Sequence, residues 1–303
     1  MTGSSREFQP EASRTTAKVQ ALDPGLYLVA TPIGNLRDIT LRALDVLANA
    51  DRVLAEDTRV TKRLLDAHGV SAMLQPYHDH NGERVRPLVL DALEAGEVVA
   101  LVSDAGTPLV SDPGYKLVRE VIAAGHEVVA IPGASAALAA LCIAGLPTDC
   151  FTFAGFPPPK TAAREVWLAR FMDSPGSLVF YEGASRLPAA LNSMAEVFGD
   201  RPAAVCRELT KLHEEARRGG LAELAAHYAE AGAPKGEVVI VVAPAAPDLW
   251  DDARIDEALR AALQTQRVKD AAADIAAKAG RPRRDVYARA LALKADTAQG
   301  RAG

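Results

Sequence analysis

The stretch Val98-Val-Ala-Leu-Val-Ser-Asp-Ala-Gly-Thr-Pro-Leu-Val-Ser-Asp-Pro-Gly-Tyr115 joins an apolar run to a segment with helical spacing. The run Val98–Val102 contains no polar residue, which is typical of a strand buried on both faces of a sheet. Ser103–Gly114 then packs two prolines, two glycines, two serines and two aspartates into one connection. A strand-to-helix connection usually needs only about two to six residues. We therefore interpret this loop as a binding surface, with simple turn formation by its aspartates as the alternative.

The same strand–loop–helix order recurs on both sides of this stretch. Short apolar runs predict strands, and segments with apolar residues three and four apart predict helices, the first with Thr40 as its N-cap. The strands are expected at residues 25–30, 51–56, 98–102 and 126–131, and the helices at 40–48, 58–68 and 114–124. Alternating strands and helices with nearly continuous apolar strands indicate a parallel sheet covered on both faces.

The sequence pattern changes near Cys150. A strand followed by three prolines predicts a switch to another domain, in which strands at 178–181, 203–206 and 237–242 alternate with helices at 164–172, 188–198 and 221–231. Beyond a linker rich in Pro and Ala, residues 255–294 are helical in pattern throughout. The fold class is thus α/β, with a parallel-sheet N-terminal domain, a second domain with a mixed sheet and a small C-terminal helical module.

These patterns divide the chain into four segments. We expect a disordered leader at 1–23, an N-terminal α/β domain at 24–134, a second α/β domain at 135–246 and a helical tail at 247–303. The leader is polar and lacks the apolar core of a signal peptide.

Composition narrows the function classes. An apolar fraction of 49% is ordinary for a globular protein, and no run reaches the ~18 apolar residues of a membrane helix, so we expect no membrane partner. Cys142, Cys150 and Cys206 form neither a metal spacing nor an even framework, which indicates a reducing cytoplasm. A net charge of −5 argues weakly against a dedicated nucleic-acid coat protein, yet allows an enzyme with a local basic patch.

Three loops rich in Gly and Pro follow predicted strands, at residues 31–36, 103–114 and 132–137. Ligands of open α/β sheets bind outside the carboxyl ends of the strands, where such loops stiffen the backbone and expose its polar groups. The dinucleotide and phosphate-loop fingerprints are absent, and no HExxH motif appears. His78-Asp79-His80 is more typical of a solvated loop than of a metal cluster, so no metal site is predicted.

Several blocks resemble the tetrapyrrole-methylase (class III) superfamily of S-adenosylmethionine-dependent methyltransferases. They include TPIGNL from Thr31, EDTR from Glu56, SDAGTP from Ser103, SDPGY from Ser111 and ELTKLHEE from Glu208, in an order that is specific as a set. The resemblance runs from about Gly25 to Val242. Within the superfamily, the blocks resemble more narrowly the branch that methylates the ribose 2′-oxygen of a cytidine in the decoding region of 16S rRNA. It implies a pair of α/β domains, S-adenosylmethionine as cofactor, the small ribosomal subunit as partner and a homodimer.

The resemblance also implies a set of cofactor contacts, made mostly through the backbone. The expected cofactor-binding residues are Pro32, Asp104, Ala105, Gly106, Thr107, Val110, Ser135, Ala136, Tyr181, Glu182 and Leu209.

A ribose hydroxyl is a poor nucleophile at neutral pH, so a nearby base would help its methylation. Glu208, Lys211 and Asp57 are the candidate catalytic residues, with His213 and His80 also considered. Lys211 could act as a base if desolvation lowers its pKa. Equally, Lys211 and Glu214 could form a surface pair, and Asp57 could cap the helix that follows it.

Cations that follow the EDTR block and cations of the tail could hold RNA phosphates. The predicted RNA-binding residues are Arg59, Lys62, Arg63, His80, Arg281, Arg283 and Arg284. In the tail, Ala276, Gly280 and Val286 have the spacing of a helix-turn-helix unit.

Three functions are weighed on this basis. The first is an RNA ribose methyltransferase, the second a small-molecule (tetrapyrrole-type) methylase, and the third a non-enzymatic nucleic-acid-binding protein. The tail and the EDTR block favour the first, and the three strand-end loops argue against the third.

Overall fold

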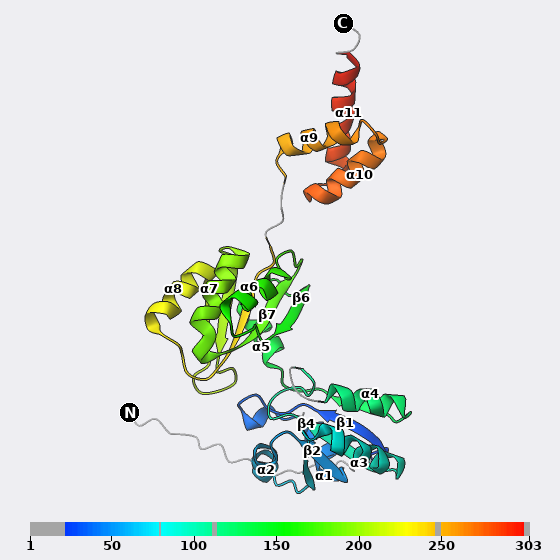
Figure 1. Cartoon of the computed structure of the whole chain (residues 1–303), viewed down its shortest axis with the longest axis vertical. Coiled ribbons are helices and arrows are strands. Elements are labelled where there is room, and N and C mark those ends of the chain that lie inside the picture. Colours follow the sequence, from blue (N-terminus) through cyan, green and yellow to red (C-terminus); the bar gives the residue numbers. More distant parts are fainter. Residues whose placement is uncertain (1–21, 79, 111–113, 246–249, 300–303) are drawn as a thin grey trace, which may run out of the picture. The chain divides into compact units, whose positions relative to one another are not determined.

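The computed structural model describes residues 22–78, 80–110, 114–245 and 250–299. It divides into two compact units, Met1–Pro244 and Ala245–Gly303, each of which is described by itself (Figure 1). The leader expected at 1–23 lies outside the described residues except for its last two positions. The domain boundaries expected at 134/135 and 246/247 stay predictions.

The apolar run Val98–Val102 forms a strand of the first sheet. The order of this sheet is β3-β2-β4-β1-β5, and each neighbouring pair is parallel, as predicted. The strands are β1 (Gly25–Val29), β2 (Arg52–Ala55), β3 (Leu74–Pro76), β4 (Val98–Val102) and β5 (Val128–Ile131). Strand β4 is central and fully buried, which explains its unbroken apolar sequence.

Helices cover both faces of this sheet. They are α1 (Leu41–Asn49), α2 (Thr58–Ala67), α3 (Gly82–Glu94) and α4 (Tyr115–Ala123). Alternate residues of β4 face opposite sides: Ala100 and Val102 pack with α1 and α2, whereas Val99 and Leu101 pack with α3 and α4. Thr40 accepts a hydrogen bond from the Ala43 N–H, which confirms the predicted cap of α1. Strand β3 and helix α3 were not predicted.

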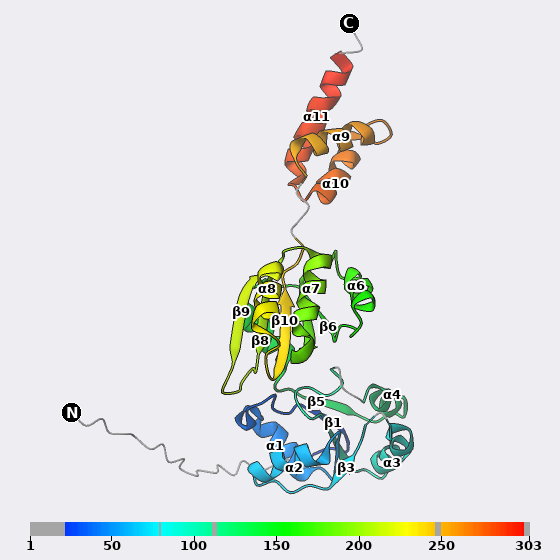
Figure 2. The same ribbon diagram turned by 60° about the vertical axis from the view of Figure 1, so that its left-hand side comes forward.

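The second sheet is mixed, as expected. Its order is β6-β7-β10-β8-β9, in which β6 and β7 are parallel and the other pairs antiparallel. Strands β8, β9 and β10 of this sheet are labelled side by side in Figure 2. The strands are β6 (Phe151–Gly155), β7 (Ser177–Gly183), β8 (Pro202–Arg207), β9 (Glu215–Gly220) and β10 (Glu237–Val242). Strand β9 was missed because Glu-Ala-Arg-Arg-Gly-Gly has no apolar pattern.

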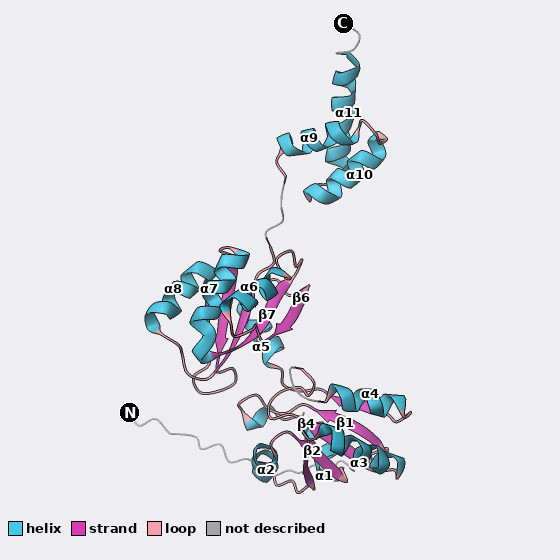
Figure 3. Cartoon of the chain, viewed as in Figure 1, coloured by secondary structure: helices cyan, strands magenta, loops and turns pink. Residues whose placement is uncertain are grey.

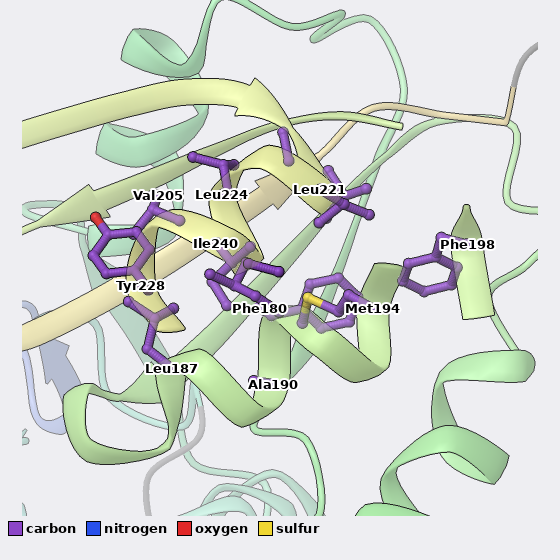
Figure 4. Packing of buried hydrophobic residues seen from close by; sticks show 14 of the residues in the cluster. Phe180, Leu187, Ala190, Met194, Phe198, Val205, Leu221, Leu224, Tyr228 and Ile240 are labelled. Carbon is purple, nitrogen blue, oxygen red and sulfur yellow. The ribbon is translucent and has the colours of Figure 1, made fainter. Parts of the chain in front are cut away.

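Helices again cover this sheet on both sides. Helix α5 (Ala136–Ala144) packs on the face that presents Val179 and Val239. On the opposite face α6 (Thr161–Ala169), α7 (Leu187–Phe198) and α8 (Leu221–Ala231) enclose a core in which Phe180 and Ile240 are fully buried (Figure 4). Short 3₁₀ turns, η1 (Leu36–Asp38) and η2 (Ala184–Arg186), follow β1 and β7.

The C-terminal unit is helical in its described residues (Figure 3). Helices α9 (Asp252–Ala262), α10 (Val268–Ala279) and α11 (Arg283–Gln299) enclose their own core around Leu259 and Ile275. Gly280 ends α10 in a left-handed conformation, and its N–H bonds to the Ala276 carbonyl. The helix–glycine–helix pattern read from the sequence is therefore present between α10 and α11. No described helix has the length and apolar character needed to cross a membrane.

Candidate active site

The three strand-end loops are tied to one another at the carboxyl edge of the first sheet. Thr31 and Gly106 exchange both backbone hydrogen bonds, at 2.9 and 3.0 Å, and the Thr31 hydroxyl donates to the Ser103 carbonyl at 3.1 Å. The Thr107 hydroxyl donates to the Ala134 carbonyl at 3.3 Å. The first part of the loop after β4, from Ser103 to Thr107, is therefore braced against both of its neighbours.

The second sheet meets this surface through Tyr181 of β7. Its phenolic oxygen accepts a hydrogen bond from the Ala137 N–H at 3.2 Å, at the start of α5. Phe153 and Phe156 pack edge-to-face on its ring, with centroid distances of 4.8 and 5.5 Å. Tyr181 thus fixes the first turn of α5 against the second sheet, and it places an aromatic wall opposite the loop after β4.

A cavity of about 450 Å³ lies between the strand-end loops and the second sheet, and we call it the first cavity. This volume lies within the range of roughly 300–1,000 Å³ that is usual for small-molecule sites. All the predicted cofactor residues line it except Pro32, which lines a neighbouring cavity. Lining residues that were not predicted are Ile33, Glu56, Phe156, Gly183, Gly236, Glu237, Val238 and Val239. Glu56 follows directly on β2 and opens the EDTR block, so both its strand-end position and that block could have indicated it.

The charge of the first cavity has one sign. Four carboxylates line it, and none of its described lining residues is Lys, Arg or His. The four are Glu56, Asp104, Glu182 and Glu237. Glu182 is buried and pairs with Arg186 at 2.6 Å, while Asp104 Oδ1 accepts the Asp57 N–H at 2.9 Å. Such a lining suits a small ligand that carries positive charge.

Between β8 and β9, the turn Glu208-Leu-Thr-Lys211 reaches into the same region. Glu208 and Thr210 have left-handed backbone conformations, with φ of 51° and 65°, which is uncommon for residues with a side chain. The buried Leu209 between them lines the first cavity, and Lys211 lines its neighbour. The strained turn therefore places Leu209 at the first cavity and Lys211 at the neighbouring one, although only one residue separates them in the chain.

Lys211 is held by two carboxylates. Its Nζ lies 2.9 Å from Glu208 Oε1 and 2.5 Å from Glu237 Oε2. Glu208 Oε1 also accepts the Glu237 N–H at 3.1 Å, and a Cβ at Gly236, whose φ is 94°, would collide with the Glu208 carboxylate. A glycine at 236 is therefore required for this network.

The network determines the charge of both partners. Burial of Lys211 lowers its pKa, but hydrogen bonds to Glu237 and Glu208 raise it more, and the net pKa lies above its usual value. The hydrogen bond from Lys211 likewise holds the pKa of Glu208 below its usual value. Lys211 is therefore an ammonium at neutral pH, and the condition under which it would act as a base is not met.

Asp57 occupies a different environment. It is absent from the described linings of both cavities, and it caps α2 by accepting the Arg59 N–H at 2.8 Å. Hydrogen bonds from the Arg59 side chain and backbone lower its pKa to about 2. The helix-cap interpretation is confirmed, and a base of such low pKa would be weak.

The predicted RNA-binding cations fall into two groups. On α2, Arg59 pairs with Asp57 at 2.6 Å and Lys62 with Asp66 at 3.0 Å, whereas Arg63 lines the neighbouring cavity. His80 lies with its ring centroid 5.9 Å from that of His78.

In the C-terminal unit, Arg281 pairs with Asp252 at 3.0 Å, and Arg284 with Asp285 at 3.3 Å. Arg283 is exposed at the start of α11. The Arg284 side chain keeps 93% of its exposure despite its ion pair. Among the described residues no group of His, Cys, Asp or Glu is placed to hold a metal ion.

Comparison with known proteins gives two family matches. Residues 25–225 match the family model "Tetrapyrrole (Corrin/Porphyrin) Methylases", and residues 251–294 match "RsmI C-terminal HTH domain". A protein of Mesorhizobium japonicum named ribosomal RNA small subunit methyltransferase I is 48% identical over 96% of this chain and 99% of its own length. One of the same name from Erythrobacter litoralis is 49% identical over 91% and 97%.

A solved structure shares the fold of the first unit. Uroporphyrin-III C-methyltransferase from Thermus thermophilus, complexed with S-adenosyl homocysteine, is 23% identical, with a TM-score of 0.51. The match covers 72% of this chain and 96% of that one. At this identity the likeness shows the two-sheet architecture and nothing finer.

Proposed function

The chain belongs to the family of tetrapyrrole (corrin/porphyrin) methylases, and from this premise we propose that it methylates the ribose 2′-oxygen of a cytidine in the decoding region of 16S rRNA. The methyl donor is S-adenosylmethionine, and the acceptor is the small ribosomal subunit. We place the reaction in the cytoplasm, with a homodimer as the working form. The relatives named for methylation of small-subunit rRNA support the choice of acceptor.

The observation that carries the proposal is the charge of the first cavity. S-adenosylmethionine bears a sulfonium, an ammonium and a carboxylate, and hence a net positive charge. The first cavity offers four carboxylates and no basic side chain among its described lining residues. Two of the carboxylates, Glu182 and Glu237, are paired with Arg186 and Lys211. Asp104 forms no ion pair among the described residues, so the lining keeps negative charge. Its apolar walls, which include Ile33, Leu209 and Val239, would suit an adenine ring. The residues present therefore fit the donor in charge and in size.

Contacts to the donor would come from both sheets. The braced loop Ala105–Thr107 and the start of α5 at Ser135 and Ala136 offer backbone groups from one side. Tyr181 and Leu209 would close the cavity from the other side. Bound S-adenosylmethionine supplies a methyl carbon activated by the sulfonium.

Two carboxylates, Asp104 and Glu237, line both the first cavity and its neighbour. Asp104 is the better placed to accept the hydroxyl proton, because Glu237 is already held by the Lys211 ammonium at 2.5 Å. The Oδ1 atom of Asp104 accepts the Asp57 N–H, and this bond fixes the orientation of the carboxylate. Asp104 would accept the ribose hydroxyl proton while the methyl group passes from sulfur to the hydroxyl oxygen, so that the sulfur–methyl bond breaks and the donor leaves as a neutral thioether. We assign Glu208 and Lys211 to positioning, with the Lys211 ammonium favouring negative charge that develops on the oxygen.

The test is a methylation assay on small ribosomal subunits from cells that lack this protein, with S-adenosylmethionine labelled in the methyl group. We expect label on one cytidine ribose, mapped at single-nucleotide level. Label on a base, or on a tetrapyrrole offered in place of RNA, would contradict the proposed acceptor. If calorimetry detected no binding of S-adenosylmethionine, the proposal of an enzyme would fail altogether.

A further inference from the structure

A second cavity of about 360 Å³ adjoins the first, and its occupant is not accounted for by the donor. One wall is formed by the loop after β1, from Thr31 to Leu36, and another by one face of α2. Lys211 and the loop after β4 complete it. The wall at η1 is anchored, because His68 Nε2 lies 3.0 Å from the Leu36 carbonyl oxygen. This groove is therefore bounded by fixed elements of the first unit.

The second cavity differs from the first in charge. It is lined by two cationic side chains, Arg63 and Lys211, where the described lining of the first has none. Its carboxylates, Asp104 and Glu237, are the two that it shares with the first cavity, and Glu237 is paired with Lys211 at 2.5 Å. Negative charge is thus confined to the common boundary, and Arg63 stands away from it on α2.

Arg63 is distinguished from the other cations of its helix. Arg59 is paired with Asp57 and Lys62 with Asp66, but among the described residues no ion pair is formed by Arg63. Its side chain is exposed and lies at the cavity. An exposed guanidinium without a carboxylate partner is well suited to a phosphate, which it can hold through two parallel hydrogen bonds.

Apolar side chains lie beside this cation. Leu36 and Val60 keep 47% and 37% of their exposure although they are large and hydrophobic, and both line the second cavity. A nucleotide has the matching character, with a phosphate at one end and a sugar and base that can lie against aliphatic side chains.

The two cavities also share their boundary. Ile33, Asp104, Ala105 and Glu237 line both. A ligand of the second cavity would therefore lie against Asp104 and Glu237, the two carboxylates that also face the first cavity. The carboxylates of the first cavity favour a cationic ligand there, whereas in the second cavity Arg63 offers a local site for an anionic group, since Lys211 is already held by Glu208 and Glu237.

We propose that the second cavity binds a single nucleotide of the acceptor RNA strand, with its phosphate on Arg63 and its ribose turned toward Asp104. This assignment rests on the proposed function, because it names the place of the acceptor at the same site. Arg63 contributes affinity for RNA and takes no part in binding the donor.

The experiment compares Arg63→Gln with Arg42→Gln, which removes an exposed cation of α1 that lines neither cavity. Two quantities are measured for each: the KM for small ribosomal subunits and the calorimetric Kd for S-adenosylmethionine. We expect Arg63→Gln to raise the KM about tenfold and to leave the donor Kd unchanged. The salt dependence of RNA binding should lose about one unit of slope, because one phosphate contact is removed. Arg42→Gln should change none of these, and Arg63→Lys should recover part of the loss.

An unchanged KM in Arg63→Gln, or an equal loss in Arg42→Gln, would overturn the assignment. So would a matching fall in donor affinity, since the groove would then belong to the donor site. If wild-type protein methylates no RNA, the proposed function fails by itself. Binding of a single-stranded RNA oligonucleotide to wild-type and Arg63→Gln protein, followed by fluorescence anisotropy, then tests the groove separately. Thermal unfolding shows whether each variant keeps its fold.

Discussion

The aliphatic stem of Lys211 lies directly across Gly34. A Cβ atom built on Gly34 would stand 2.5 Å from Lys211 Cγ and 2.7 Å from Cε, far inside van der Waals contact. Gly34 belongs to the loop after β1 and Lys211 to the turn between β8 and β9, so this close approach brings together segments far apart in the sequence. The glycine makes room for the cation that lines the second cavity.

Gly34→Ala should displace Lys211 and lower the rate of methyl transfer by about tenfold, because a misplaced group in an active site costs rate even when it stays nearby. In a Lys211→Ala background the same substitution should cost less activity than in the wild type, since the clash with the lysine stem is gone and only the strain of the positive φ at position 34 remains. Steady-state kinetics on the single and double variants measure this coupling. Gly69→Ala is the control: no atom lies within 4 Å of its Cβ, so it should cost about 1 kcal/mol of stability through its left-handed backbone but leave activity intact. Additive losses at positions 34 and 211 would contradict the contact.

Asp104→Asn should lower kcat by roughly 10²–10⁴, the usual contribution of a positioned base. The amide oxygen can still accept the Asp57 N–H, so the loop should keep its form. Single-turnover methylation measures the effect, and calorimetry with S-adenosylmethionine should still detect binding. A kcat within twofold of the wild-type value would remove Asp104 from the reaction.

Asp57→Asn should leave activity within about twofold, because asparagine caps a helix as well as aspartate does. The pKa of Asp57 is lowered from 3.8 to about 2, so its ionised form is favoured in the folded state. That contribution to stability is complete above pH 3.8 and is lost as the pH falls toward 2. Because asparagine does not ionise, the free energy of unfolding of the variant should decrease less steeply than that of the wild type as the pH falls across this window. Acid-unfolding curves of the two proteins measure the difference. A large loss of kcat would instead return Asp57 to the list of catalytic residues.

Deletion of residues 247–303 should abolish methylation of small subunits but preserve binding of S-adenosylmethionine. The removed helices form their own compact unit around Leu259 and Ile275. The described residues that line the two cavities all belong to the other unit, and the last of them in sequence is Val239. Calorimetry and the subunit assay on the truncated protein provide the two readouts. Normal methylation by the truncated protein would refute a role for the tail in holding RNA.

Local patterns in the sequence determined the architecture. The unbroken apolar run of β4, the N-cap at Thr40 and the helical spacing around Gly280 each depend on neighbours within a few residues, so they were legible before any contact was known. Strand β9 was missed because both charged and small residues occupy it, and only pairing with β8 makes it a strand.

The cofactor residues were inferred by resemblance, and the structure gathers all of them but Pro32 around one cavity. The sequence alone did not show which side chains lie next to each other, or how those neighbours set the protonation state of each titratable group. The carboxylates of Glu208 and Glu237, which keep Lys211 protonated, stand far apart in the chain, and their effect on its pKa depends on distances of a few ångströms. Likewise, Arg59, Lys62 and Arg63 read alike in sequence. Only folding pairs the first two with carboxylates and leaves the third at a groove, because electrostatic partners are chosen by proximity in space.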